Sequence, residues 1–196
     1  LGHFNFATED VLRGIIEAAR DADAPAVMVG TSEGEAGFVG IKEAVALVKT
    51  MREGMNYPVF LNADHFKSIQ KVKAAIDAGY DSVIADGSKL SIFDNIAFTK
   101  ASVDYARSIN PNISVEGELG YLKGSSEVQI KVEIDPSDYS KPEEVAYFVS
   151  RTGVDRMAVV FGNIHGIVTD QEEKLDIEHF AKIVAVYQSG HFPDGE

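Results

Sequence analysis

The stretch Val59-Phe60-Leu61-Asn62-Ala63-Asp64-His65 places a carboxylate and an imidazole directly after a run of apolar, strand-forming residues. A histidine also follows an apolar run at Met157-Ala158-Val159-Val160-Phe161-Gly162-Asn163-Ile164-His165-Gly166. Between the two, further apolar runs end in carboxylates, at Asp86 and at Glu116-Gly117-Glu118. Buried strands rarely carry charge where only packing is required. Strands that end in such groups therefore predict one polar site at one end of a sheet or barrel.

Strand and helix patterns alternate along the rest of the chain. Strands are predicted at Phe4–Phe6, Pro25–Gly30, Pro58–Leu61, Ser82–Ala85, Ile113–Leu119 and Arg156–Phe161. Helices are predicted from Thr8, over Ile41–Arg52, from Ser68 to Ala78, over about Asn95–Ser108, from Ser140 to before Gly153, and over about Ile177–Gln188. Gly54 and Gly79 stand where helices stop, and Ser140-Lys141-Pro142-Glu143 has the spacing of a capping box.

Two stretches are predicted as loops. The segment from Thr31 to Gly37 either contacts a substrate or is a flexible crossover. The longest irregular stretch covers about Gly120–Tyr139 and is rich in glycine, serine and charged residues.

About six β-α units in series predict a parallel sheet with right-handed crossovers. An open doubly wound sheet and a TIM barrel both satisfy this order, but no G-x-G-x-x-G follows a strand. Polar residues at the carboxyl ends of several strands favour the TIM (β/α)8 barrel. Because such a barrel takes about 250 residues, we expect one incomplete barrel domain over residues 1–196, with strands seven and eight absent.

Composition excludes several functional classes. The chain has 196 residues, 45% of them hydrophobic and 25% charged, which is typical of a globular protein. A formal net charge of −13 argues against nucleic acid as a partner. No apolar stretch is long enough to span a bilayer, and the first residues do not form a signal peptide. The absence of cysteine excludes thiolate metal sites and fits a cytoplasmic location.

Four motifs together resemble the class II, metal-dependent fructose-bisphosphate aldolase family, which includes the tagatose-bisphosphate aldolases. These are Asn62–His65, Ile84-Ala85-Asp86-Gly87-Ser88, Val115–Gly120 and Gly162–Gly166. The resemblance runs from Phe4-Asn5-Phe6 through the helix after Ile177. It implies a TIM barrel that reversibly cleaves fructose 1,6-bisphosphate into dihydroxyacetone phosphate and glyceraldehyde 3-phosphate, a step of glycolysis and gluconeogenesis. It also implies a zinc cofactor and a dimer or tetramer of identical chains.

The resemblance also implies residue roles. His65 and His165 would bind the catalytic zinc, and Asp64 would be the acid-base residue that serves the aldehyde oxygen. Asp86 and Glu118 match positions that bind a second or alternative cation, divalent or monovalent. The residues expected at the substrate are Asn5, Ser32 and Gly166, the last contacting a phosphate group or its counter-ion.

The chain departs from the family pattern in two places. The family's third zinc histidine and its main phosphate loops follow strands seven and eight, and the sequence ends before either. His191 is therefore given a structural role, as are His3 and His179. After strand five the family has two glycines and then acidic residues, one of which deprotonates the substrate carbon. Here the loop continues through Ser125 and Ser126, so either Glu127 takes that role one position later or the role is missing.

Alternatives remain open at this point. Asp86 could cap the next helix or anchor its loop, and Glu116 could replace Glu118 as a ligand because the two share a strand face. The protein could act on another phosphorylated ketose such as tagatose 1,6-bisphosphate. It could also be a non-catalytic metal-binding or assembly subunit. We expect little or no aldolase activity from these 196 residues alone.

Overall fold

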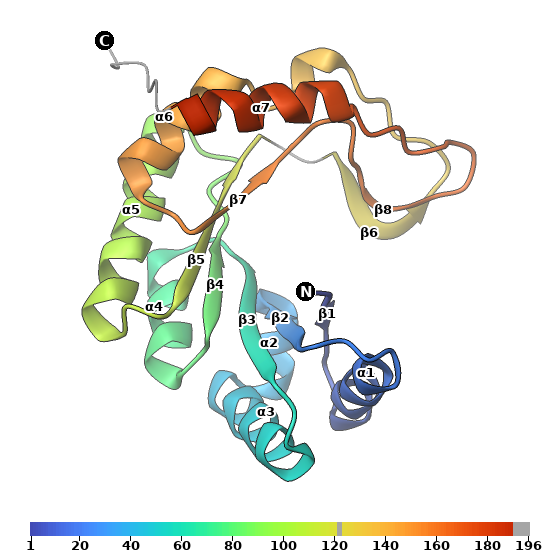
Figure 1. The fold of residues 1–196 in the computed structure, drawn as a ribbon, viewed down its shortest axis with the longest axis vertical. Coiled ribbons are helices and arrows are strands. Elements are labelled where there is room, and N and C mark those ends of the chain that lie inside the picture. The colour runs from blue at the N-terminus through green and yellow to red at the C-terminus, as the bar shows by residue number, and fades with distance from the viewer. Residues whose placement is uncertain (121–122, 190–196) are drawn as a thin grey trace. The chain divides into compact units, whose positions relative to one another are not determined.

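The computed structural model describes residues 1–120 and 123–189, except for the side chains of 124–127. It confirms an α/β fold, in which helices and strands alternate along the chain (Figure 1). The residues group into two compact units. The first comprises Leu1–Asp86 and Ala101–Glu116, and the second comprises Gly87–Lys100 and Gly117–Glu196.

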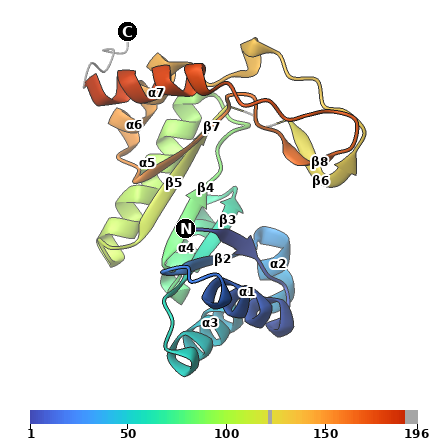
Figure 2. The ribbon, with the colours of Figure 1, turned by 45° about the vertical axis from the view of Figure 1, so that its right-hand side comes forward.

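The first unit contains a parallel sheet with helices packed against it. Its elements are β1 (His3–Asn5), α1 (Glu9–Asp21), β2 (Val27–Ser32), α2 (Glu33–Val39), α3 (Ile41–Met55), β3 (Val59–Phe66), α4 (Ile69–Ala78) and β4 (Ser82–Ala85). Strands β1 to β4 pair in chain order, each parallel to the next. Helix α1 packs against β2, α3 against β3, and α4 against both β3 and β4 (Figure 2). Parallel pairing brings the carboxyl ends of these strands to one edge.

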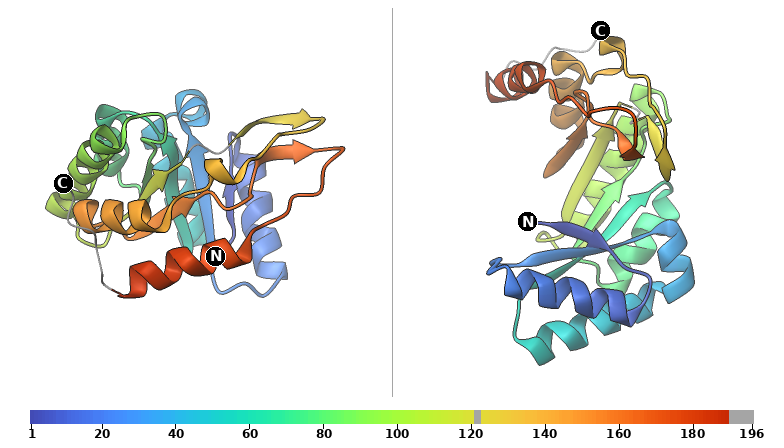
Figure 3. Two further views of the ribbon diagram at one scale, coloured as in Figure 1. Left: turned by 90° about the horizontal axis from the view of Figure 1, so that it is seen from above. Right: turned by 90° about the vertical axis from the view of Figure 1, so that its right-hand side faces the viewer.

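Helix α5 (Ile92–Ile109) and strand β5 (Ser114–Leu119) each have residues in both units. The second unit also contains β6 (Gly124–Gln129), the 3₁₀ helix η1 (Pro136–Asp138), α6 (Pro142–Thr152), β7 (Arg156–Val159), β8 (His165–Val168) and α7 (Ile177–Ser189). Helices α6 and α7 pack together. Strands β6 and β8 form a separate two-stranded parallel ribbon (Figure 3).

The main sheet has six strands in the order β1-β2-β3-β4-β5-β7, which confirms the six strands predicted from the sequence. The ribbon of β6 and β8 was not predicted, because β6 lies in the stretch that we expected to be irregular. Neither ribbon strand has a strong apolar alternation. Each pairs with a strand that is distant in sequence, so a local pattern does not reveal it.

Burial explains why the strands of the first unit hold together. Val29, Leu61 and Val83 are at most 1% exposed and are packed under the helices. The hydroxyl groups of Thr31 and Tyr80 lie 2.8 Å apart within this buried region. Burial raises the pKa of the Tyr80 phenol, although its hydrogen bond to Thr31 acts in the opposite direction. No helix of the described residues is both long enough and apolar enough to cross a membrane.

The predicted helix ends at Thr8, Ser68 and Gly79 are confirmed, and the one at Gly54 is not. The side chains of Thr8 and Ser68 accept hydrogen bonds from backbone N–H groups in the first turns of α1 and α4. Gly79 ends α4 in the left-handed conformation. The predicted stop at Gly54 is wrong, because α3 continues to Met55 and Asn56 (φ 46°) takes the left-handed position. Asparagine tolerates that conformation better than other non-glycine residues.

The structure has capping boxes at Ser32 and at Asp135, and none at the predicted position. The loop expected after Thr31 is helix α2, which begins with a capping box between Ser32 and Glu35. The capping box predicted at Ser140 is wrong, because the N-cap of α6 is Lys141 and makes no side-chain hydrogen bond. A proline within this turn replaces one N–H that a cap would otherwise satisfy.

The Ser140 hydroxyl instead joins two strand ends. It donates to the carbonyl of Leu119 at 2.7 Å and accepts from the N–H of Val160 at 2.8 Å. The imidazole Nε2 of His179 lies 2.8 Å from the Ser140 carbonyl, in agreement with the structural role expected of that histidine. Hydrogen bonds of one buried serine thus connect the end of β5 to the residue that follows β7.

Candidate active site

The carboxyl end of β3 contains a bulge at Asp64 and His65. Ala63 pairs with Val83, and the next pair is Phe66 with Ala85, so Asp64 and His65 together oppose one residue of β4. His65 has φ 51°, which is uncommon for a residue other than glycine. Bulges beside functional sites redirect side chains. Here the bulge leaves Nε2 of His65 3.9 Å from Oδ1 of Asp64.

Asp64 is held by a residue of β1. Nδ2 of Asn5 donates to Oδ2 of Asp64 at 2.7 Å. Gly30 is on β2, the strand between β1 and β3, and pairs with Asn5 on one side and Asn62 on the other. A Cβ atom at position 30 would lie 2.5 Å from Oδ1 of Asn5 and would also collide with the ring of His3. The missing side chain of Gly30 therefore makes room for the hydrogen bond between Asn5 and Asp64.

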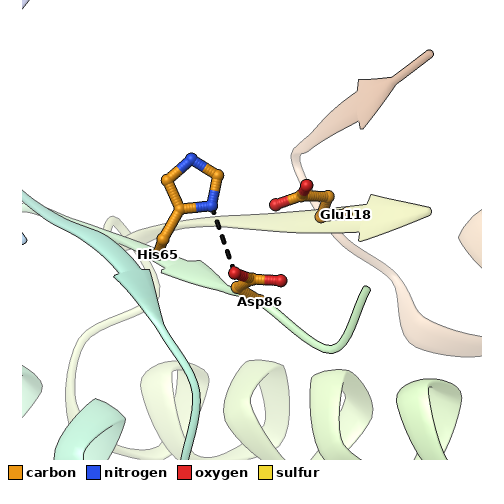
Figure 4. Close-up of side chains that lie close together, drawn as sticks. All are labelled: His65, Asp86 and Glu118. Atoms are coloured by element: carbon orange, nitrogen blue, oxygen red, sulfur yellow. Dashed lines mark ion pairs between the residues drawn. The ribbon is translucent and has the colours of Figure 1, made fainter. Parts of the chain in front are cut away.

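His65 faces a second carboxylate across β3 and β4. Its Nδ1 atom lies 3.4 Å from Oδ2 of Asp86 (Figure 4). The Asp86 side chain is 8% exposed and also lies 4.0 Å from Nζ of Lys67. Asp86 does not cap the following helix, because α5 begins at Ile92 and its first turn is bound by Ser91. The structure thus brings His65 and Asp86 together and contradicts the capping alternative.

Glu118 lies in the second unit, near the end of β5, and is 7% exposed. Its backbone carbonyl accepts a hydrogen bond of 2.8 Å from Nδ2 of Asn95, and Oδ1 of Asn95 accepts one of 3.1 Å from Thr99. The Glu118 side chain ends in a carboxylate, a group of the kind that binds metal ions.

Asn95 and Thr99 are residues that sequence reasoning missed. Both are at most 2% exposed, although both are polar, and they are spaced one turn apart on α5. Two hydrogen-bonding side chains one turn apart in a helix pattern were the available signal.

His165 is in the second unit, at the start of β8. A turn at Asn163 leads to it: Oδ1 of Asn163 accepts from the Phe161 N–H at 2.8 Å, and its Nδ2 donates to the Val159 carbonyl at 3.3 Å. The His165 N–H donates to the Lys123 carbonyl at 3.0 Å. Gly166 follows with φ 95°, a conformation that glycine adopts without strain.

The remaining predicted site residues have different outcomes. Ser32 pairs with Asp64 in the sheet, and its hydroxyl accepts from the Glu35 N–H at 3.3 Å, so this side chain starts helix α2. The backbone of Glu127 belongs to β6, but its side chain lies outside the described residues. His191 also lies outside them.

Glu33 is a further residue that the sequence did not single out. Its Oε1 accepts from the Lys67 N–H at 2.7 Å, and its Oε2 lies 2.5 Å from Nζ of Lys71. Burial alone would raise the pKa of Glu33, but the hydrogen bonds from Lys67 and Lys71 outweigh it and lower that pKa. Glu33 thereby connects the start of α2 to Lys67, directly after β3, and to Lys71 in α4.

A profile of the family described as fructose-bisphosphate aldolase class-II matches residues 1–192. The chain belongs to this family. A fructose-bisphosphate aldolase of Geobacillus stearothermophilus is 36% identical over 186 residues, which are 93% of this chain and 62% of the relative. The chain thus spans less than two thirds of the length of that relative.

Solved aldolase structures share the fold. The YdjI aldolase of Escherichia coli K12 superposes with a TM-score of 0.77 at 29% identity, over 98% of this chain and 64% of that protein. A fructose-bisphosphate aldolase of Campylobacter jejuni superposes with a TM-score of 0.74 at 20% identity, over 96% of this chain and 60% of that protein. The family resemblance inferred from the four motifs is confirmed, and class II aldolases are metal-dependent.

Proposed function

We propose that the protein that carries this chain is a class II aldolase that reversibly cleaves fructose 1,6-bisphosphate into dihydroxyacetone phosphate and glyceraldehyde 3-phosphate. Family membership supports the reaction class. The observation that carries the proposal is the pairing of His65 with Asp86, beside Asp64, at the carboxyl ends of β3 and β4. In barrels of this kind, catalytic residues come from strand ends at that face.

The spacing of His65 and Asp86 fits a shared metal ion. Two ligands of a tetrahedral zinc with bonds of about 2.0–2.1 Å lie roughly 3.3 Å apart, and Nδ1 of His65 is 3.4 Å from Oδ2 of Asp86. A direct charge-assisted hydrogen bond would be shorter, at about 2.7–2.9 Å. Imidazole and carboxylate ligands suit zinc.

We assign the ligands His65 and His165 to zinc, and Asp86 and Glu118 to the same ion or to a second cation. When bound, the metal would act as a Lewis acid toward negative charge that develops on the substrate carbonyl oxygen. Imidazole ligands must be neutral to bind, so metal affinity will fall in acid.

The chain's own residues would then move protons and hold the substrate. Asp64 accepts the proton of the substrate hydroxyl as the carbon–carbon bond breaks and the aldehyde forms. The Asn5 amide donates to Oδ2 of Asp64 and so holds the carboxylate in place. Glu127 protonates the carbon left behind. Ser32 and the N–H of Gly166 hold substrate oxygens. The Gly166 N–H suits a phosphate group, because backbone N–H groups bind phosphate without a basic side chain.

The proposal extends to the barrel fold, the oligomeric state and the cellular location of the protein. The superposition on the YdjI aldolase supports a TIM barrel for the protein that carries this chain, with residues 1–196 as part of one domain. We propose a cytoplasmic homo-oligomer, a dimer or tetramer, that binds a phosphorylated ketose.

The test is a coupled cleavage assay on the protein that carries this chain, with fructose and tagatose 1,6-bisphosphate as parallel substrates. Each is measured as purified, after EDTA, and after addition of Zn²⁺. We expect cleavage that EDTA abolishes and Zn²⁺ restores. Tagatose 1,6-bisphosphate cleaved faster than the fructose compound would reassign the substrate and keep the aldolase chemistry.

Variants locate the activity. Asp86→Asn should lower zinc affinity, and Asp64→Asn should abolish cleavage while zinc stays bound. Asp94→Asn is the matched control, because Asp94 is an exposed carboxylate bonded to Ser91 at the start of α5. Cleavage that survives EDTA, or full activity in Asp64→Asn, would contradict the proposal.

A further inference from the structure

The backbone of His165 is held on one side by Lys123, just before β6, and on the other by Gln129 of β6. Its N–H donates to the carbonyl of Lys123 at 3.0 Å. Its carbonyl accepts a hydrogen bond of 3.0 Å from Nε2 of Gln129. The two peptide planes that flank the Cα atom of His165 are therefore both held by hydrogen bonds to the segment 123–129. Because φ and ψ are the only soft backbone dihedrals of a residue, these bonds fix the position and direction of the Cα–Cβ bond of His165.

The two hydrogen bonds differ in the partner of His165, which is a backbone group in one and a side chain in the other. The bond from the His165 N–H to Lys123 joins two backbone groups, so a side-chain change at Lys123 would leave it in place. The bond to the His165 carbonyl comes from a side chain and exists because residue 129 is glutamine. Gln129 is itself anchored, because its carbonyl accepts from the Thr169 N–H at 3.0 Å.

The same bond orients the next peptide group. No described peptide bond is cis, and in a trans peptide the carbonyl and the N–H point in opposite directions. Since the carbonyl of His165 points toward Gln129, the N–H of Gly166 points away from it. Gly166 has φ 95°, so the chain turns here in a way that glycine permits. One amide side chain thus sets both His165 and the Gly166 N–H.

We propose that Gln129 is a positioning residue that sets the metal affinity of His165 and the direction of the Gly166 N–H toward a substrate phosphate group. This rests on the proposed function of the same site. Strand β6 also contains position 127, so the ribbon joins the segment of the assigned carbon acid-base residue to a zinc ligand.

If Gln129 had a purely structural role, loss of its amide would lower the unfolding temperature of the protein. The ribbon buries little apolar surface, since Val128 is 69% and Ile167 is 66% exposed. Exposed two-stranded ribbons open locally and contribute little to the global stability of a protein. Loss of the Gln129 amide should therefore leave the unfolding temperature unchanged, and any change in metal affinity would report positioning.

The test compares Gln129→Met with the wild type in the full protein that carries this chain. Methionine keeps the length of the side chain and removes the N–H donor. Gln70→Met is the matched control, because Gln70 is an exposed glutamine on α4. Zinc affinity is measured by competition with a chromophoric chelator, KM and kcat by the coupled assay, and the unfolding temperature in EDTA.

We expect Gln129→Met to weaken zinc binding by about tenfold, the lower end of the effect of partners that orient metal ligands. KM should rise, and the unfolding temperature in EDTA should stay the same. Zinc affinity and KM equal to those of Gln70→Met would overturn the positioning role. A wild type that binds no zinc, tested beside His165→Ala, would overturn the proposed function itself.

Discussion

Substitution of Gly30 by alanine should test how the first unit positions Asp64. A Cβ at this position would lie 2.5 Å from Oδ1 of Asn5. Asn5 must then move, and its 2.7 Å hydrogen bond to Asp64 is lost. We expect a destabilised protein in which Asp64 is less well oriented.

The magnitude follows from three contributions. A hydrogen bond to a charged group contributes about 1.5–3 kcal/mol, and the lower value applies because the Asp64 side chain is 17% exposed. Overpacking costs about 1–3 kcal/mol. Alanine restricts the unfolded chain and returns about 0.4–1 kcal/mol. The net loss from Gly30→Ala is therefore about 2 kcal/mol in the free energy of unfolding.

Urea unfolding in EDTA measures this loss, with Gly14→Ala as the control. Gly14 is inside helix α1, and no atom lies within 4 Å of the place that its Cβ would take, so its substitution should stabilise the protein by about 1 kcal/mol. A double-mutant cycle with Asn5→Ala adds a second criterion, because two changes that break one hydrogen bond are not additive. Equal stability of the two glycine variants, or full additivity with Asn5→Ala, would refute the reasoning.

Three further substitutions have defined outcomes. Glu33→Gln should lower the free energy of unfolding most above pH 4.5, the ordinary pKa of this carboxyl group. Because folding lowers the pKa of Glu33, its stabilising contribution is complete above 4.5 and disappears as pH falls through the folded pKa. Urea unfolding at a series of pH values measures the difference. Tyr80→Phe leaves the buried Thr31 hydroxyl without its partner and should cost about 1 kcal/mol in the same assay. Gly162→Ala, at φ 105° and against the carbonyl of Lys174, should weaken zinc binding in a chelator titration, whereas unchanged affinity would show that this turn does not position His165.

Local patterns predicted the elements well because the interactions behind them span only a few residues. The caps at Thr8 and Ser68 join a side chain to an N–H three residues later. The wrong prediction at Ser140 has the same origin. Its sequence spacing fits a capping box, but its hydroxyl is bound to Leu119 and Val160, about twenty residues away on either side.

The sequence by itself determined the alternation of strands and helices, the family, and the placement of Asp64, His65, Asp86 and Glu118 near strand ends. Apolar periodicity and local motifs are sufficient for these features. Only the tertiary structure decided the bulge at His65. It also decided the ribbon in which Gln129 holds His165, a hydrogen bond between residues 36 positions apart. Such bonds depend on which strands become neighbours, and no short stretch of sequence contains that information.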